Sequence, residues 1–157
     1  MGAAVEVNLS EVKGLAQKIA SFMLSGDDTG DLLNSLGLVI EEQTKERIDI
    51  TKRDPKGDPW RELTERYKAR KIQGDKDGIP YGPSGGGILT RENYLLDSIE
   101  YQLLGSDSVL VGSSMEYADY HQNAKSEKRR REFLGINTDN IAELQDTVDE
   151  FMKRQVA

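Results

Sequence analysis

Residues 98–135 read SIEYQLLGSDSVLVGSSMEYADYHQNAKSEKRRREFLG, and this stretch decides the fold. Over residues 99–103 apolar side chains alternate with polar ones, which is the period of a half-buried strand. Turn-forming residues follow at 105–107, and residues 108–111 return as a second strand. We therefore predict an antiparallel hairpin over residues 98–112. The side chains expected to face the helices are those of Ile99, Tyr101, Leu103, Val109 and Val111.

Helices are predicted on both sides of this hairpin. A first helix is expected over residues 9–23, with an apolar stripe that packs in the core. A second spans residues 31–51; its first half is apolar and its second half is mostly charged, so its end should project from the body. A last helix begins at residue 137 or 138 and should pack across the sheet. The predicted fold class is α+β, a small antiparallel sheet packed by three main helices in a single domain over residues 1–157.

The composition bounds the possible functions. With 36% hydrophobic and 31% charged residues the chain forms only a thin core, which favours a subunit that completes its burial against neighbours. The net charge of −7 argues against nucleic acid as the main partner. The absence of cysteine excludes disulfides, thiolate metal sites and thiol nucleophiles. There is no apolar run of membrane-spanning length and no signal peptide, so we expect no membrane partner and a chain that stays in the cytosol where it is made.

A glycine-rich stretch occupies residues 73–87 and holds six of the fifteen glycines. It lacks both the Gly-Lys-Ser/Thr of a P-loop and the GxGxxG of a dinucleotide site, so no cofactor is expected. Because glycine raises the entropy lost on ordering, we predict an arm or lid that orders against a neighbouring protein through Tyr81. A loop folded back on its own domain is the alternative.

Trp60 is the single tryptophan and follows Pro59. A lone tryptophan is typical of a core, but this polar setting is equally typical of an interface anchor, so both interpretations stay open. The next stretch, residues 63–72, predicts a short and strongly basic helix whose charged face is interpreted as solvated.

His121 is the only histidine. A catalytic interpretation would pair it with Asp119 or Glu116, and would take Ser113 or Ser114 as the nucleophile. A triad ordinarily draws on separate elements, however, and one histidine without cysteines does not make a typical zinc site. We interpret the residue as a packed structural histidine and predict neither catalysis nor a metal, with a small hydrolase as the alternative.

A basic run at residues 125–131 contains an interrupting glutamate. Its simplest interpretation is a solvated loop, and its most specific one is a salt-bridge surface for an acidic neighbour. Combined with the basic residues at 66–71 it gives a second alternative function, a nucleic-acid-binding module.

Two motifs lie between the hairpin and the last helix, YAxxHQ at 117–122 and REFLG at 131–135. With the DPW at 58–60 and the ILT and LLDSI segments before the hairpin, this order of features resembles the phage virion morphogenesis, or tail completion, family of Mu-like and other contractile-tailed phages. The likeness covers roughly the last two thirds of the chain. Two positions depart from the family, because Asn123 and Asn93 stand near places where it has glycine. The residues that carry the structural signature are Tyr117, Ala118, His121, Gln122, Phe133, Leu134 and Gly135.

The resemblance implies a structural virion protein that acts in tail completion or head–tail joining, as an oligomeric ring at the tail end. It implies tail tube, sheath or head–tail connector proteins as partners, and a place in the tail or neck of the virion after assembly in the host cytoplasm. The uneven charge further predicts that the homo-oligomeric ring is held by polar contacts. The expected contact residues are Arg129, Arg130 and Arg131 of one subunit and Glu41, Glu42 and Glu46 of its neighbour.

Overall fold

The computed structural model describes residues 2–12, 14–15, 17–18, 29–73, 88–89, 94–105, 108–126, 129–136 and 138–156. The strands are β1 (Ala3–Asn8), β2 (Ile99–Leu104) and β3 (Ser108–Ser113). The helical elements are η1 (Leu9–Glu11), α2 (Thr29–Glu46), η2 (Arg47–Thr51), α3 (Glu65–Gln73), α4 (Tyr94–Asp97), α5 (Glu116–Asn123) and α6 (Thr138–Val156). The chain has the α+β fold that the sequence predicts.

The three strands form one antiparallel sheet in the order β1-β3-β2. The hairpin prediction is confirmed, because Tyr101 pairs with Val111 and Leu103 pairs with Val109. The five side chains predicted to face the helices all belong to the core or pack against it. The central strand β3 is almost wholly buried, since β1 and β2 cover both of its edges.

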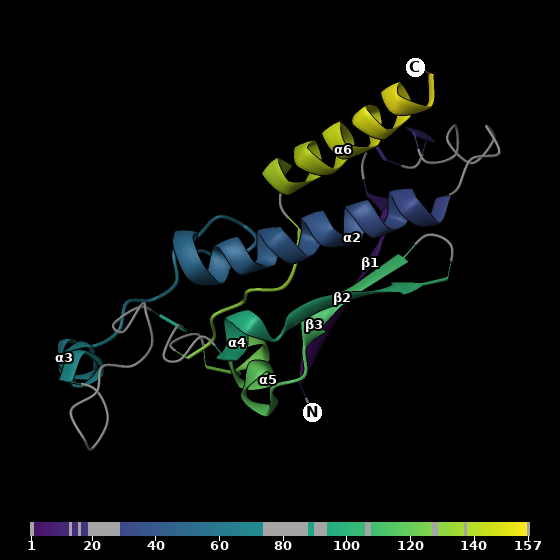
Figure 1. The fold of residues 1–157 in the computed structure, drawn as a ribbon. Coiled ribbons are helices and arrows are strands. Elements are labelled where there is room, and N and C mark those ends of the chain that lie inside the picture. The colour runs from purple at the N-terminus through teal and green to yellow at the C-terminus, as the bar shows by residue number, and fades with distance from the viewer. Residues whose placement is uncertain are drawn as a thin grey trace.

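Figure 1 shows that α2 and α6 form successive layers over this sheet. Helix α2 packs directly on β2 and β3, and α6 packs on α2. The prediction that the last helix lies across the sheet is therefore wrong in this detail, because the apolar stripe of α6, with Leu144 and Val148 fully buried, is covered mainly by α2. Helix α2 thus buries two faces, one against strands and one against a helix.

The second half of the long helix does not project into solvent, contrary to the sequence prediction. Gln43 and Thr44 are buried near the end of α2, and Arg47 and Ile48 are buried in the π-helical turn η2 that extends it. Most polar groups of these side chains have partners: the Thr44 hydroxyl donates to the Ile40 carbonyl at 2.8 Å, and Gln43 Nε2 donates to the Glu143 carboxylate at 2.9 Å. Gln43 Oε1 has no partner among the described residues. A polar segment can be buried at little cost when its polar atoms are hydrogen-bonded.

The predicted first helix begins differently from the expectation. Leu9–Glu11 form the short 3-10 helix η1, and Gly14 has a positive φ of 83°, which a continuous α-helix does not allow. Leu9 and Leu15 are nevertheless fully buried, so the expected role of the apolar stripe in the core is confirmed for these residues. Positions 19–28 lie outside the described residues.

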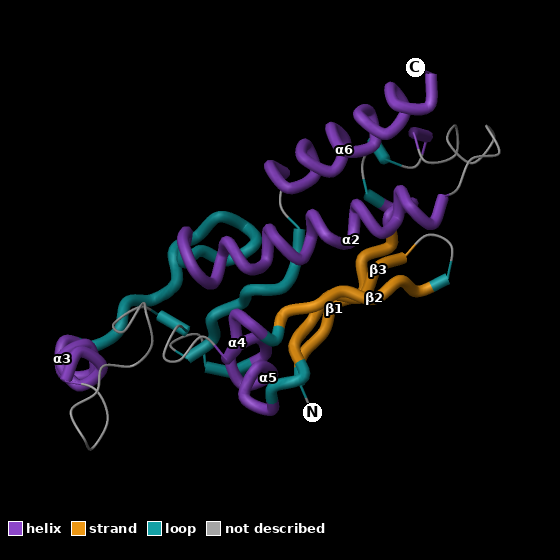
Figure 2. The backbone as a smooth tube through the Cα atoms, in the orientation of Figure 1, coloured by secondary structure: helices purple, strands orange, loops and turns teal. Residues whose placement is uncertain are grey.

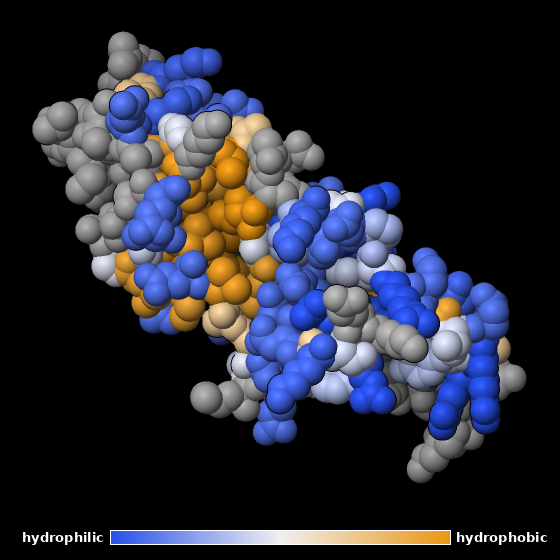
Figure 3. All heavy atoms as spheres, turned by 180° about the vertical axis from the view of Figure 1, so that it is seen from behind, coloured by the Kyte–Doolittle hydropathy of each residue, from blue (hydrophilic) through white to orange (hydrophobic). Residues whose placement is uncertain are grey.

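Figure 2 shows how much of the chain between α5 and α6 is loop, which matters for the site described below. Seen from behind in Figure 3, apolar residues gather over the broad part of the molecule and the end that carries α3 is hydrophilic. Within the described part of the chain, no helix combines the length and the apolar character needed to cross a membrane.

Gly37 sets the distance between α2 and β2. A Cβ atom at this position would lie 2.3 Å from Cδ2 of Tyr101. Glycine in a helix interior ordinarily costs about 1 kcal/mol relative to alanine, so an open site would be stabilised by alanine. Here we expect Gly37→Ala to lower the free energy of unfolding by roughly 1–3 kcal/mol, because the strand or the ring must shift. Urea unfolding measures the change.

A double-mutant cycle supplies the control for Gly37. In a Tyr101→Ala background the added methyl group has room, so Gly37→Ala should become neutral or stabilising. An equal loss of stability with and without the tyrosine ring would contradict the proposed close contact.

Candidate functional site

The segment at residues 131–134, between α5 and α6, is held on one side by the side chain of Gln122. The Gln122 Oε1 atom accepts hydrogen bonds from the backbone N–H groups of Phe133 and Leu134, each at 3.0 Å. The Gln122 amide group also donates to the Leu134 carbonyl at 3.3 Å. One side chain therefore satisfies three backbone groups of a segment that has no sheet or helix to satisfy them. We call residues 131–134 the clamped segment.

Two long side chains from other elements also hold the clamped segment. The Arg47 guanidinium donates to the Phe133 carbonyl at 2.8 Å, and the Trp60 indole N–H donates to the Glu132 carbonyl at 2.8 Å. In addition, the Arg131 backbone N–H donates to the His121 carbonyl at 2.7 Å. The loop is thus tied to η2, to α5 and to the segment before α3 at once.

Trp60 belongs to the core of this site. Its side chain is 6% exposed, and its only polar group is engaged by the Glu132 carbonyl. The interpretation of Trp60 as an interface anchor is therefore corrected in favour of the core alternative, because little of the indole is left for another protein.

Arg47 connects the clamped segment to α6 as well as to α2. Its guanidinium also donates to the Asn140 side chain at the start of α6. Burial lowers the pKa of Arg47 to about 10, while Asp54 and Glu46 act in the opposite direction. The group stays charged at neutral pH, so its hydrogen bonds to carbonyl oxygens are charge-assisted.

The signature residues of the two motifs have structural explanations here. Ala118 is fully buried where α5 packs against β1, and Phe133 is fully buried beside the Gln122 clamp. Gly135 has a φ of 141°, and a Cβ atom there would lie 2.9 Å from Cγ of Pro55. The glutamine, the apolar pair and the glycine are therefore those that a tightly held loop requires.

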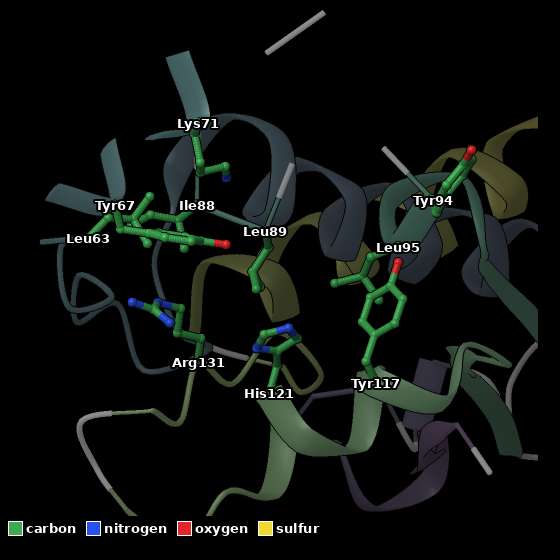
Figure 4. Close-up of a pocket in the computed structure, with 10 residues that line it drawn as sticks. All are labelled: Leu63, Tyr67, Lys71, Ile88, Leu89, Tyr94, Leu95, Tyr117, His121 and Arg131. Carbon is green, nitrogen blue, oxygen red and sulfur yellow. The ribbon is translucent and has the colours of Figure 1, made fainter. Parts of the chain in front are cut away.

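A cavity of about 510 Å³ opens beside the clamped segment. Figure 4 shows side chains from α3, α4 and α5 around it, with Leu89 above His121 and with Tyr67 and Arg131 on one side. Its lining is largely apolar and aromatic, with a few polar groups. The described lining residues are Leu63, Tyr67, Lys71, Ile88, Leu89, Tyr94, Leu95, Tyr117, His121 and Arg131.

His121 is neutral in this environment. Burial lowers its pKa to about 4, and the positive charge of Arg131 lowers the pKa further in the same direction. Tyr117 and Tyr120 pack edge-on against the imidazole ring, with centroids 6.1 and 5.4 Å away. The Nδ1 atom is buried and has no hydrogen-bond partner among the described residues.

The charged groups among the described lining residues are cationic. Lys71 is 3% exposed, with its ammonium group 5.9 Å from the centre of the Tyr67 ring. Lys52, which does not line the cavity, donates to the Ile88 carbonyl at 2.7 Å, and burial lowers its pKa to about 8 against the effect of Asp49. Burial also lowers the pKa of Arg131, whose guanidinium donates to the Arg61 carbonyl at 3.0 Å. None of the described lining residues is acidic.

The groups of the hydrolase alternative are not assembled into a triad. The Ser113 hydroxyl lies 2.5 Å from the Ser98 hydroxyl and accepts from the Met115 N–H, while His121 Nδ1 has no partner in the part of the chain that the structure describes. Asp119 accepts a hydrogen bond from the Asn123 side chain at 2.7 Å. Within the described ranges, no cluster of three or more His, Asp and Glu residues is placed to hold a metal ion.

A second hollow, of about 440 Å³, lies along the outer side of α2 and η2. We call it the acidic groove, because Glu42, Glu46, Asp49 and Asp97 line it together with Lys45, Ile50 and Leu96. Ile50 is 69% exposed here, which is unusual for a large apolar side chain in the described part of the chain. The groove includes two of the three glutamates predicted as contact residues.

The other predicted contact residues have different environments, and only some of them are exposed. Glu41 forms an ion pair with Lys45 at 2.7 Å, and Arg130 forms one with Glu132 at 3.4 Å. Arg131 belongs to the clamped segment, whereas Arg129 is exposed. Tyr81 and the rest of the glycine-rich arm at 74–87 lie outside the described residues.

A comparison with known proteins identifies the family. A model of the phage virion morphogenesis family matches residues 7–153. The chain belongs to this family. Mu-like prophage FluMu G protein 1 from Haemophilus influenzae is 25% identical over 135 residues, which cover 86% of this chain and 84% of that protein. No solved structure matches the chain.

For this virion morphogenesis protein, sequence reasoning found the motif residues but missed several that complete the site. Arg47 and Lys71 lie in charged stretches that predict solvated faces, and both are buried. A useful signal was available for Arg47, because it adjoins Ile48, the late apolar position of the same helix.

Proposed function

We propose that this virion morphogenesis protein is a structural, non-enzymatic subunit that acts in tail completion or head–tail joining. The observation that carries the proposal is the family match over residues 7–153, which includes both motifs that build the clamped segment. The protein would lie in the tail or neck of the virion and contact the tail tube, the sheath or the head–tail connector.

The two oppositely charged surfaces of the subunit favour a homo-oligomeric ring. The acidic groove lies on α2 and η2, whereas exposed basic residues lie on α3 and at Arg129. Two different surfaces of one chain that complement each other make a heterologous contact, which closes into a ring when the rotation permits. Because Arg131 is bound within its own subunit, we expect Arg129, Arg66 and Arg70 to meet Glu42 and Glu46 of the neighbour.

Complementation tests the function itself. Phage that carry a stop codon in this gene should produce either heads and tails that fail to join or tails with abnormal ends. Negative-stain electron microscopy would show both defects. Expression of the wild-type chain in trans should restore infectious particles. Normal particles without the chain would contradict the proposal.

Salt should weaken the ring. Exposed ion pairs are screened at high ionic strength, so light scattering across a salt series should show a larger assembly at low salt and smaller species at high salt. Glu46→Lys should dissociate the ring at low salt, and Arg129→Glu in the same chain should partly restore it.

Asp146→Lys is the matched control for the charge reversal, because Asp146 is exposed on α6 and away from the acidic groove. It should leave the assembly unchanged. If neither salt nor Glu46→Lys changed the particle mass, a ring held by these contacts would be ruled out.

A further inference from the structure

The cavity beside the clamped segment has the size and lining of a binding site rather than of a packing defect. Its volume of about 510 Å³ falls in the range of ligand pockets, and it lies among three helices and a loop held by defined hydrogen bonds. Packing voids inside proteins are ordinarily smaller than this.

The opening of the cavity carries exposed aromatic side chains. Tyr67, Tyr94 and Tyr117 come from three different helices and are 45%, 59% and 40% exposed. Tyrosine combines a large apolar ring with a polar tip and is enriched at protein interfaces. The apolar floor, formed by residues such as Leu63 and Leu95, suits an apolar or aromatic side chain of a partner.

The polar chemistry of the cavity favours a negatively charged group. Lys71 and Arg131 are cationic, and no described lining residue is a carboxylate. This concentration of positive charge stands out in a chain with a net charge of −7. Partly buried cations bind carboxylates through charge-assisted hydrogen bonds, which are stronger in a site that excludes water than at an open surface.

His121 adds an independent observation. Its Nδ1 atom is buried without a partner in the described part of the chain, and a buried polar atom in that condition destabilises the free protein. A peptide that entered the cavity could supply the missing backbone partner. The imidazole lies between Arg131 and Tyr117, so it would report any occupant (Figure 4).

We propose that this cavity binds a peptide segment of a partner protein in which an aromatic residue adjoins an aspartate or glutamate. The aromatic side chain enters between the exposed tyrosines, and the carboxylate pairs with Arg131. This site goes beyond the proposed assembly role and does not depend on the ring, because the cavity lies within a single subunit.

Nuclear magnetic resonance on the intact chain tests the proposal, with the imidazole signals of the single histidine as the readout. The probe is acetyl-Gly-Phe-Asp-Gly-amide, and the matched control is the same peptide with Asn in place of Asp. We expect the Asp peptide to shift the His121 signals and to bind about tenfold more tightly than the Asn peptide, a ratio that corresponds to about 1.4 kcal/mol. The ratio should shrink at high salt.

Two variants locate the binding. Arg131→Gln should remove most of the preference for Asp over Asn, and Tyr94→Ala should weaken both peptides while leaving the preference intact. Leu38→Ala is the control, because this exposed side chain on α2 does not line the cavity. Circular dichroism checks that each variant is folded.

Three results would overturn the proposal. The first is the absence of a His121 shift at millimolar peptide, and the second is equal binding of the Asp and Asn peptides. The third is a shift of the His121 signals on raising the protein concentration alone at high salt, where the proposed ring contacts are screened, which would assign the cavity to a second copy of this chain. A failure of the ring tests would leave the peptide result unaffected, so the two proposals are distinguishable.

Discussion

Replacement of Gln122 by alanine should lower the free energy of unfolding by roughly 2–4 kcal/mol. The substitution leaves the N–H groups of Phe133 and Leu134 without their acceptor, and both residues are almost fully buried. An unsatisfied buried N–H costs about 1–3 kcal/mol, and two are lost here together. Urea unfolding followed by circular dichroism measures the difference.

Gln122→Glu provides a conservative comparison. A carboxylate keeps the acceptor for both N–H groups but cannot donate to the Leu134 carbonyl, so we expect a smaller loss than with alanine. Gln102→Ala, at an exposed position on β2, should change stability by no more than about 0.5 kcal/mol. If Gln122→Ala were as mild as Gln102→Ala, the clamp would not be an important source of stability.

The hairpin was predictable from sequence because its signal is local. Alternation over residues 99–103 and the turn at 105–107 lie within a few residues of each other, and burial of one face fixes the register. The same holds for the long α2–η2 helix and for α6, whose periodicity is strong.

The packing of these helices was less accessible, because it depends on contacts between distant residues. The charged residues at the end of α2 and in η2 predict a solvent-exposed helix end. In the structure, however, Arg47 donates to the Phe133 carbonyl and to the Asn140 side chain, which lie about ninety residues further along the chain. Once η2 is held in this way it cannot project. In the same way, α6 finds its apolar partner on α2 rather than on the sheet.

The candidate site, too, was predictable only where its residues are close together in the sequence. The motif residues near His121 were found because YAxxHQ and REFLG are contiguous patterns. The cavity was not found, because its walls come from three helices and a loop far apart in the chain. Trp60 could not be assigned to core or interface from its neighbours alone, since the Glu132 carbonyl that engages it lies 72 residues away.

The stability of the protein should fall as the pH is lowered from 6.5 to 4, and His121 should account for much of this fall. The pKa of the imidazole is about 4 in the folded chain and near 6.5 in the unfolded chain. Between these values the unfolded chain binds more protons, so stability rises with pH. The contribution of His121 is complete above pH 6.5 and is lost as the pH falls through 4. A shift of this size corresponds to about 3 kcal/mol, which partial exposure reduces to roughly 1–3 kcal/mol.

Comparison with His121→Gln isolates this effect from other titrating groups. The groups that face the imidazole are Arg131 from the clamped segment, Tyr67 and Lys71 from α3, Tyr94 from α4, and Tyr117 and Tyr120 from α5. These groups are present in both the wild type and the glutamine variant, so the comparison isolates the imidazole. The carboxylates of the chain are the same in both proteins, so their contributions cancel in the difference. Urea unfolding at several pH values should therefore show a steeper loss of stability in the wild type than in the glutamine variant. Parallel curves would contradict the prediction. They would mean that the His121 imidazole binds a proton as readily in the folded chain as in the unfolded chain, so that burial does not disfavour the imidazolium.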